Sequence, residues 1–589
     1  MTSQTRAAFE RTSFAIVGAI AGLAFWGLLD LLPDSGLNQR LILFISSAGL
    51  GFFGVLLALM GPTRLIPAAA AAAAVALPAA GLLVWASLRF AQVDVFLEQG
   101  HSVLAVILVL TIAVPYVAAS LSDSEGWRDY AQLFDLSWTI VVRYAAAWLF
   151  VAVAWGVLLL SDALLGLVGI TVIADLLEIE AVPFLISGLV LGLALAIVHE
   201  LREYVSPFLL IQLLRLLLPV LLVVLGVFIL ALPLRGLSGL FGHFSAATVL
   251  GSVAFAGITL VTTAIHRDDE MAVQGAWMQG AAQVLALLLW VPAGLAVYAV
   301  WLRVAQYGLT PDRVAAMIAA VLVTVYALLY GGAVARRADW AGRIRAVNRV
   351  MAMIVAAVAV LWLTPVLNAQ RLSVNSQLAR AADPDVAAAE LAVWEMTHDW
   401  GHAGRAGLEK LRTMQERPDH AALLALIDKA AVTPDRWQYF DSSAVAGLQS
   451  LDDVVPVRPP GVTLPAGALD ALHGNDRQRI HKGCAQGVPL EDGAMGAGCV
   501  LVMGEFNPDR AGRQGMLFFL GEGAFASAMG LVLTDRGFVQ SGRIANAANG
   551  DMARIGPDEI ADLLAGRYAI VPVTRNALEV GGMRIIPEN

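Results

Sequence analysis

An arginine inside a long apolar run is the residue of this sequence that most directly suggests chemistry. Arg215 lies in the run 208–232, with Gln212 three positions earlier. Charged side chains are costly within a bilayer and often mark sites there. Arg215 is expected to pair with Glu200 or Glu203, to bind an anionic substrate or lipid headgroup, or to extend to the nearby membrane surface. The last role is favoured, because Arg215 lies only a turn or two from the start of the run.

Other patterns that could carry chemistry are weaker. Asp94, Glu98 and His101 lie together before an apolar run, and a membrane-embedded transferase acting on lipid-linked substrates would need such a set. The sequence has no phosphate-binding glycine loop, no nucleophile elbow and no clustered Cys/His spacing. We therefore expect no catalytic residues, no metal site and no cofactor.

The composition shows what surrounds these residues. Of 589 residues, 58% are hydrophobic and 14% are charged, and the mean hydropathy is +0.72. Charged residues make up about 10% of residues 1–370 and about 21% of the rest. These values predict an integral membrane protein with a water-facing C-terminal part. They exclude a single soluble enzyme, a disordered chain and a nucleic-acid binder, since neither part is basic.

Long apolar runs predict the membrane-spanning helices, because a bilayer core of ~30 Å needs about 20 apolar residues. Eleven such runs are present, and the stretch 164–177 is too short to add another. They cover 13–32, 41–61, 65–88, 102–121, 143–161, 182–199, 208–232, 246–265, 276–301, 313–334 and 349–368.

The distribution of arginine predicts the orientation, because positive charge on short loops is retained in the cytoplasm. Thirteen arginines lie on the N-terminus and even-numbered loops, and five lie on the odd-numbered loops. The first set is Arg6, Arg11, Arg64, Arg128, Arg143, Arg202, Arg215, Arg267, Arg336, Arg337, Arg343, Arg345 and Arg349, and the second is Arg40, Arg89, Arg235, Arg303 and Arg313. This predicts a cytoplasmic N-terminus and, with eleven spans, an extracytoplasmic C-terminal part.

Cysteine usage agrees with that orientation. The chain has two cysteines, Cys484 and Cys499, both in the C-terminal part. A disulfide between them would suit an oxidising compartment and would contribute about 3 kcal/mol. Two small buried thiols are the alternative.

Glycines on two of the apolar runs predict a close contact between helices. Gly18 and Gly22 in the first run, and Gly188 and Gly192 in the sixth, form faces that allow close helix contact.

The tenth run is preceded by Thr310, Pro311 and Asp312. Thr310 is expected to cap the helix, Pro311 suits the first helical position, and Asp312 complements the helix dipole.

The C-terminal part is predicted to be a helical neck followed by a small, mainly β, α+β domain. The predicted domains are a transmembrane helical domain at 1–370, the neck at 371–440 and the extracytoplasmic β-rich domain at 441–589. Helical spacing covers 385–398, 402–416 and 419–431, and a short helix is expected at 558–565. Strands are expected at 499–503, 516–520, 529–534, 538–543, 568–573 and 577–586, with a turn at 535–537.

Four segments resemble the bacterial multipass membrane family named domain of unknown function 4153 (DUF4153). They are WLRVAQYGLTPDR at 301–313, RIRAVN at 343–348, RLSVNSQLAR at 371–380 and WGHAGRAGLEKL at 400–411. The resemblance implies a bacterial cytoplasmic-membrane protein, and it supplies no substrate, reaction or catalytic residues. The region after about residue 440 matches no motif of that family.

Three functions remain in competition. The first is a non-enzymatic envelope protein that presents its extracytoplasmic module for assembly, sensing or partner binding. The second is a transporter or permease for a small, anionic solute bound at Arg215, and the third is the transferase described above. Expected partners are the lipid bilayer of the bacterial inner membrane and other envelope proteins, and no nucleic acid.

Overall fold

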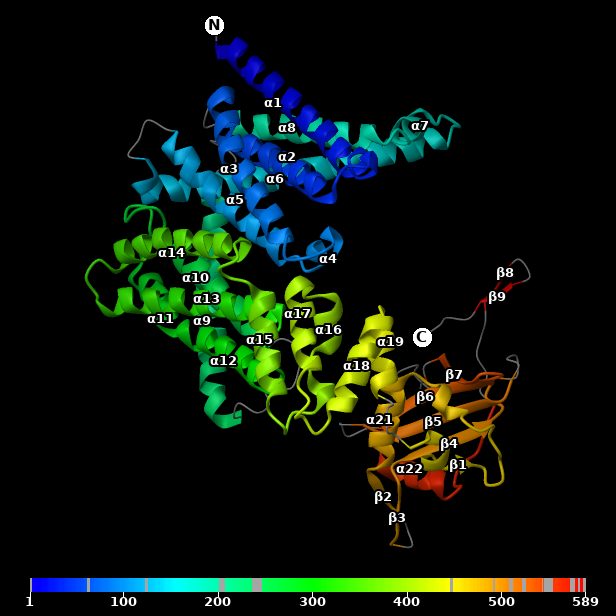
Figure 1. Ribbon diagram of the computed structural model, residues 1–589. Coiled ribbons are helices and arrows are strands. Elements are labelled where there is room, and N and C mark those ends of the chain that lie inside the picture. Colours follow the sequence, from blue (N-terminus) through cyan, green and yellow to red (C-terminus); the bar gives the residue numbers. More distant parts are fainter. Residues whose placement is uncertain are drawn as a thin grey trace. The chain divides into compact units, whose positions relative to one another are not determined.

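The computed structural model divides the chain into two compact units, residues 1–427 and 428–589. We call them the membrane unit and the C-terminal unit, and Figure 1 labels their elements. The residues described are 3–60, 64–121, 126–200, 207–235, 246–444, 449–490, 493–507, 512–521, 526–542, 544, 555–572, 578–580 and 583–585.

The predicted fold class is confirmed: a mostly helical membrane unit is followed by a region with a small sheet domain. Among the described residues, eleven helical spans are long and apolar enough to cross a membrane. Their helices are α1 (Ser3–Trp26), α2 (Gln39–Leu59), α3 (Leu65–Ser87), α5 (His101–Ser120), α6 (Tyr130–Gly166), α8 (Ala181–Glu200), α9 (Pro207–Arg235), α10 (Ala246–Ile265), α11 with α12 (Ala276–Leu288 and Trp290–Tyr307), α13 (Pro311–Ala335) and α14 (Trp340–Leu363). The short helices α4 (Val93–Glu98) and α7 (Val172–Leu177) lie between spans.

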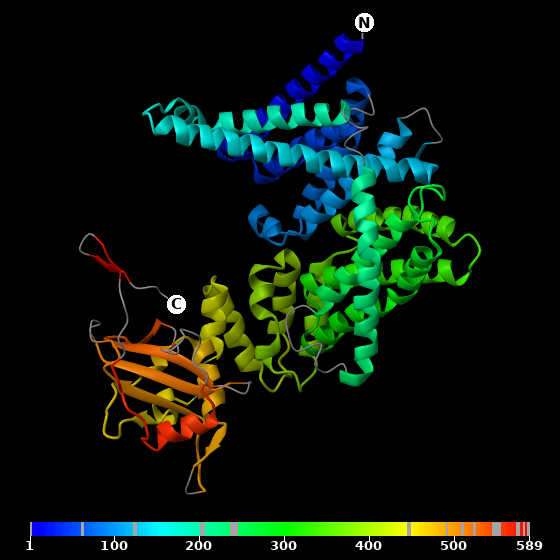
Figure 2. The same cartoon turned by 180° about the vertical axis from the view of Figure 1, so that it is seen from behind.

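Several helices begin earlier than the apolar pattern indicates, among them α1, α6 and α14. The fifth span, α6, starts at Tyr130 and runs uninterrupted for 37 residues, which Figure 2 shows in light blue to cyan. The last, α14, starts at Trp340, so Arg343, Arg345 and Arg349 belong to a helix and not to a loop. Both helix starts are polar, and the N-cap side chains Asp129 and Asp339 accept a backbone N–H there.

The closest helix pairing joins α1 to α8. Gly18 and Gly22 face Gly188 and Gly192, so the two predicted small-residue faces meet each other. A Cβ atom added at Gly188 would lie 2.2 Å from the carbonyl oxygen of Gly18. The two backbones therefore touch directly, which only glycine permits at these positions.

Alanine supplies much of the remaining contact. On α3 the alanines at 68, 72 and 76 are almost fully buried and follow a four-residue spacing. Around α10, the buried residues Ala264, Leu285 and Tyr330 belong to one core shared by α9, α10, α11 and α13. Small side chains bring the helix axes together, since lipid gives no hydrophobic drive for helix association.

The helices after the last span pack on the loops at one end of the spans. They are α15 (Ala369–Ala381), α16 (Val393–His398), α17 (Gly401–Arg412) and the first part of α18 (His420–Val432). Gln377 donates to the carbonyl of Tyr307 at 3.1 Å, and the backbone N–H of His402 donates to Arg89 at 2.9 Å. The segments 301–313, 371–380 and 400–411 are thus joined by contacts at this end.

The C-terminal unit is built on a five-stranded sheet with strand order β1-β4-β5-β6-β7. Only β1 pairs in parallel, with β4. The strands of this sheet are β1 (Val457–Arg458), β4 (Cys499–Gly504), β5 (Gln514–Leu520), β6 (Ala526–Thr534) and β7 (Gly537–Gly542). Two further sheets have two strands each. One pairs β2 (Gly487–Pro489) with β3 (Met495–Ala497), and the other pairs β8 (Leu578–Val580) with β9 (Met583–Ile585). The helices are α19 (Arg436–Ala444), α20 (Leu451–Val454), α21 (Gly474–Cys484) and α22 (Pro557–Leu564).

Both faces of the sheet are covered. Leu501 and Phe519 belong to a core with Ile480 of α21, while Val500 and Phe518 belong to a core with Ile560 of α22. Burial on both faces explains why β4 reads as a continuous apolar run. The predicted strands at 499–534, the turn at 535–537 and the helix near 558 are all present.

Two predicted strands in this unit are wrong, and one helix was not predicted. The segment predicted as one strand at 577–586 contains two short strands, β8 and β9, which pair with each other. Residues 568–572 form no strand. The helix α21 is missing from the prediction, because its sequence is rich in charged residues and glycine and buries few side chains, among them Ile480 and Cys484. Residue 543, at the end of one predicted strand, lies outside the described residues.

Substitution of Gly188 by Ala tests the contact between α1 and α8. The added methyl group would overlap the backbone of α1, so Gly188→Ala should lower the free energy of unfolding by about 1–3 kcal/mol, measured by thermal unfolding in detergent. The matched control is Gly156→Ala on α6, where the new Cβ meets no atom within 4 Å. Equal stability of the two variants would contradict the direct backbone contact.

Candidate functional site

Arg215 lies on α9 and donates its hydrogen bonds to the backbone of the next span and its following loop. Its Nε reaches the carbonyl of Thr263 at 2.9 Å, and Nη2 reaches that of Met271 at 2.7 Å. The residue is 5% exposed, so it does not extend to the surface as expected. Thr263 belongs to the last turn of α10, where carbonyls lack partners within the helix. Arg215 therefore supplies a hydrogen-bond donor to the C-terminal end of α10.

The other members of the predicted site lie apart from Arg215. Glu200, at the end of α8, accepts two hydrogen bonds from Nε of Arg11 on α1, at 2.8 and 2.9 Å. Gln212 is half-buried on α9, and no hydrogen bond between it and Arg215 is present in the described part of the chain. Glu203 lies outside the described residues. The structure therefore does not bring this set together.

The loop after α10 forms a charged cluster around Arg215. Arg267 pairs with Asp135 of α6 at 2.6 Å, and Arg345 of α14 pairs with Asp269 at 2.8 Å. His266 is buried beside them, with its ring 4.9 Å from that of Phe134. Burial lowers the pKa of His266 to about 4, and the neighbouring arginine charges act in the same direction. His266 is thus neutral at pH 7.

A second polar cluster was not anticipated from the sequence. The side-chain oxygen of Asn348, on α14, accepts hydrogen bonds from Tyr326 at 3.0 Å and Tyr330 at 2.5 Å, and its Nδ2 donates to Tyr130 at 2.9 Å. The hydroxyl of Thr262 lies 2.8 Å from that of Tyr330. These five side chains join α6, α10, α13 and α14. The four-residue spacing of Tyr326 and Tyr330 was the available signal, since it places both on one helix face.

Other arginines repeat the role of Arg215 at other helix ends. Arg143 is 2% exposed and donates to the carbonyls of Ala58 and Met60, at 2.6 and 2.7 Å. Arg345 donates to Ile265 at 2.8 Å. Arg89 donates to Trp362 and Thr364, both at 2.7 Å, at the end of α14. A guanidinium suits this task because it presents several donors in a fixed fork.

The cap before α13 has the geometry that the sequence suggests. The Thr310 hydroxyl accepts the backbone N–H of Arg313 at 3.3 Å, and Pro311 occupies the first turn. Asp312 lies 3.2 Å from Nε2 of His101, one of the three residues considered for a transferase. Asp94 lies in the first turn of α4 and Glu98 at its end, ahead of His101.

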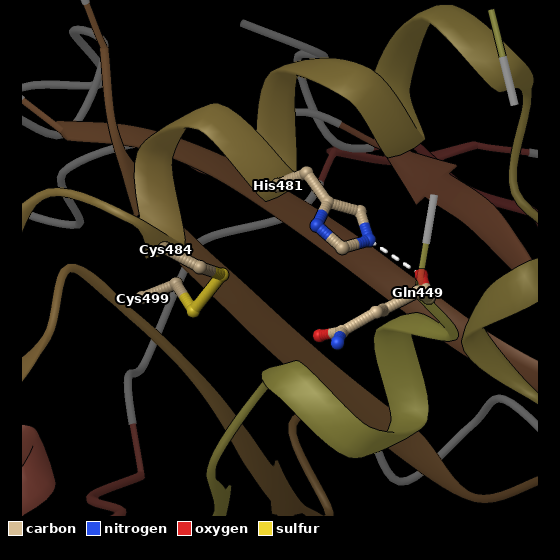
Figure 3. Close-up of a disulfide and its surroundings, with 4 residues drawn as sticks. All are labelled: Gln449, His481, Cys484 and Cys499. Carbon is tan, nitrogen blue, oxygen red and sulfur yellow. Dashed lines mark hydrogen bonds between the residues drawn. A yellow bond between two sulfur atoms is a disulfide. The ribbon is translucent and has the colours of Figure 1, made fainter. Parts of the chain in front are cut away.

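The two cysteines form a disulfide, with the sulfur atoms 1.98 Å apart. Figure 3 shows that the bond joins the end of α21 to the beginning of β4. Both cysteines are buried, and the neighbouring ring of His481 contacts the carbonyl of Gln449. The bond therefore fastens a helix with few apolar side chains to the sheet.

A second set of contacts, centred on the carboxylate of Asp470, holds α21 in place. The carboxylate accepts hydrogen bonds from the hydroxyl of Ser450 at 2.6 Å and the backbone of Leu451 at 3.0 Å, and Arg477 of α21 lies 2.8 Å away. Burial acts to raise the pKa of Asp470, but these partners outweigh it and hold the pKa below its usual value.

Substitution of Arg215 tests its structural role. Arg215→Gln leaves buried carbonyls at the end of α10 without donors, so the free energy of unfolding should fall by roughly 2–4 kcal/mol. Thermal unfolding in detergent measures this, and Arg371→Gln on the exposed face of α15 is the control. A stable Arg215→Gln chain that had lost only a transport activity would instead assign Arg215 to a substrate.

No protein-family model, no curated protein and no solved structure matches the chain. Within the described residues, no three His, Cys, Asp or Glu side chains are grouped so as to hold a metal ion. The arginines donate to backbone carbonyls at helix ends, and the side chains of the Asn348 cluster bond to one another across four helices. Both sets therefore act to hold the helices together.

Proposed function

We propose that the chain is a non-enzymatic multipass protein of a bacterial cytoplasmic membrane that presents its C-terminal unit outside the cytoplasm. There the unit would serve envelope assembly, sensing or partner binding. The observation that carries the proposal is a separate compact unit with a buried disulfide, attached to eleven apolar spans. A disulfide persists where the compartment is oxidising. We also propose, from the four quoted segments, that the chain belongs to the DUF4153 family.

Contacts between the ends of the spans support the alternation of the spans from which the orientation is proposed. Arg11 near the N-terminus meets Glu200 after the sixth span, and Arg349 donates to the carbonyl of Arg128. All four lie on the face predicted to be cytoplasmic. Arg89 and Thr364 meet on the other face. In each contact, both partners lie at span ends that the arginine count assigns to the same side of the membrane.

The position of the helices after the last span supports an extracytoplasmic C-terminal unit. The backbone N–H of His402 and the side chain of Gln370 contact Arg89 and Gln99, which follow the third span. An odd number of spans places these loops opposite the N-terminus. With the N-terminus in the cytoplasm, α15 to α17 would then lie outside.

Transport is the weaker alternative, because Arg215 was its main support. The hydrogen bonds of that guanidinium go to Thr263 and Met271, and the residue is 5% exposed. An arginine held in this way already stabilises a helix end. We therefore do not propose a solute site at Arg215.

Cysteine labelling tests the orientation. Asp535→Cys adds an exposed thiol to the turn between β6 and β7, and Arg336→Cys adds one after α13, while the native cysteines stay in their disulfide. In intact spheroplasts a membrane-impermeant maleimide should label Asp535→Cys at once and Arg336→Cys only after permeabilisation. The unsubstituted chain is the control, and the opposite labelling order would reverse the orientation.

Truncation tests the role of the C-terminal unit. A chain ending at Ile427 keeps the whole membrane unit. It should insert normally yet reproduce the phenotype of complete gene deletion, and it should lose any envelope protein that cross-links to the full chain. A truncated chain that restores the wild-type phenotype would show that the membrane unit carries the function.

A further inference from the structure

A cavity of about 480 Å³ lies among α2, α5, α6 and α14. Its walls include Gly51 and Gly54 of α2, Leu110 and Pro115 of α5, and Ile140 of α6. At these two glycines the wall formed by α2 has no side chain, which leaves part of the space open. All four helices are membrane spans.

The cavity opens sideways toward the lipid. Leu50, Ile107 and Val141 line it, and they are 36%, 52% and 54% exposed. Exposed apolar side chains on a membrane span face lipid tails. The mouth of the cavity therefore adjoins the hydrocarbon of the bilayer.

The interior offers little to water. The hydroxyl of Tyr144 donates to Gly54 at 3.0 Å, and that of Ser137 donates to Leu133 at 2.7 Å. A buried water needs two to four polar partners, and the lining hydroxyls of Tyr144, Ser137 and Tyr116 already donate elsewhere, which leaves only that of the exposed Thr111 among the lining residues. An apolar chain is thus the occupant that the interior fits.

Two arginines outside the cavity lining, Arg128 and Arg349, lie beside one end of the cavity. Tyr116, in its wall, donates to the backbone of Arg349 at 3.1 Å, and Ala352, one turn later on α14, also lines it. Arg349 donates through Nη1 to the carbonyl of Arg128, and its Nε is buried without a partner. Neither arginine forms an ion pair with a carboxylate in the described part of the chain.

Trp127 marks the level of this end in the membrane. It is 44% exposed, and the guanidinium of Arg128 lies 5.3 Å from its ring. Exposed tryptophan next to arginine is typical of the headgroup level. The N-terminus of α6 and the C-terminus of α5 lie at this end, and both belong to the arginine-rich face of the protein.

We propose that the cavity binds an anionic phospholipid, with one acyl chain inside and the phosphate at Arg128 and Arg349. Each buried CH₂ group of the chain contributes about 0.8 kcal/mol against water, but lipid neighbours already shield it in the bilayer. Selectivity therefore comes from the charge of the two guanidinium groups. Both headgroups carry a phosphate, but phosphatidylglycerol is net anionic, whereas the choline cation of phosphatidylcholine cancels the phosphate charge and is repelled by arginine. The site is independent of the proposed role of the C-terminal unit.

Native mass spectrometry of the delipidated full chain tests the site, with phosphatidylglycerol and phosphatidylcholine of identical acyl chains as probes. Phosphatidylglycerol should bind at least ten-fold more tightly. Gly54→Leu fills the cavity, since a Cβ there meets no atom within 4 Å, and should weaken binding of both lipids ten-fold or more. The control, Gly81→Leu on α3, also adds its side chain in open space and should bind as the wild type does.

The arginine variants separate headgroup recognition from chain binding. Arg128→Gln, at an exposed residue, and Arg349→Gln should each weaken phosphatidylglycerol binding more than phosphatidylcholine binding, so that the difference between the two lipids shrinks. Thermal unfolding shows that each variant is folded. Equal binding of both lipids by the wild type, no bound lipid, or phosphatidylglycerol binding that survives Gly54→Leu would each overturn the proposal.

Discussion

The membrane unit depends on hydrogen bonds from arginine to the backbone carbonyls at helix ends. The last four carbonyls of a helix have no partner within it, and a bilayer offers none. Arg143 supplies donors to the end of α2, Arg215 to α10 and Arg89 to α14. Arg143 lies on α6, Arg215 on α9 and Arg89 in the turn after α3, so the same bonds also fix how the spans pack against one another.

This requirement explains an oddity of composition. The first lysine of the chain is Lys410, so all cationic side chains of the spans are arginine. An ammonium is a point charge on a flexible stem, while a guanidinium bridges two carbonyls at once. Arg143 and Arg215 also belong to the larger arginine set from which the orientation is predicted, whereas Arg89 belongs to the smaller set.

The sequence alone was enough to predict the spans and the central strands, because each rests on a run of apolar residues. It was not enough to predict what Arg215 contacts, since Met271 lies 56 positions away and only the fold brings the two together. The Asn348 cluster has the same origin, with partners on three other helices. The helix α21 was missed because a disulfide and the Asp470 contacts hold it in place of a broad apolar face.

The glycine contact between α1 and α8 also sets an order of biosynthesis. Gly22 and its partner helix are separated by roughly 170 residues, which a ribosome adds in about ten to thirty seconds. During that time α1 is in the membrane with a bare backbone face, while the four spans of α2, α3, α5 and α6 are inserted before its partner. The pairing that closes the first half of the bundle is therefore completed late, by the sixth span.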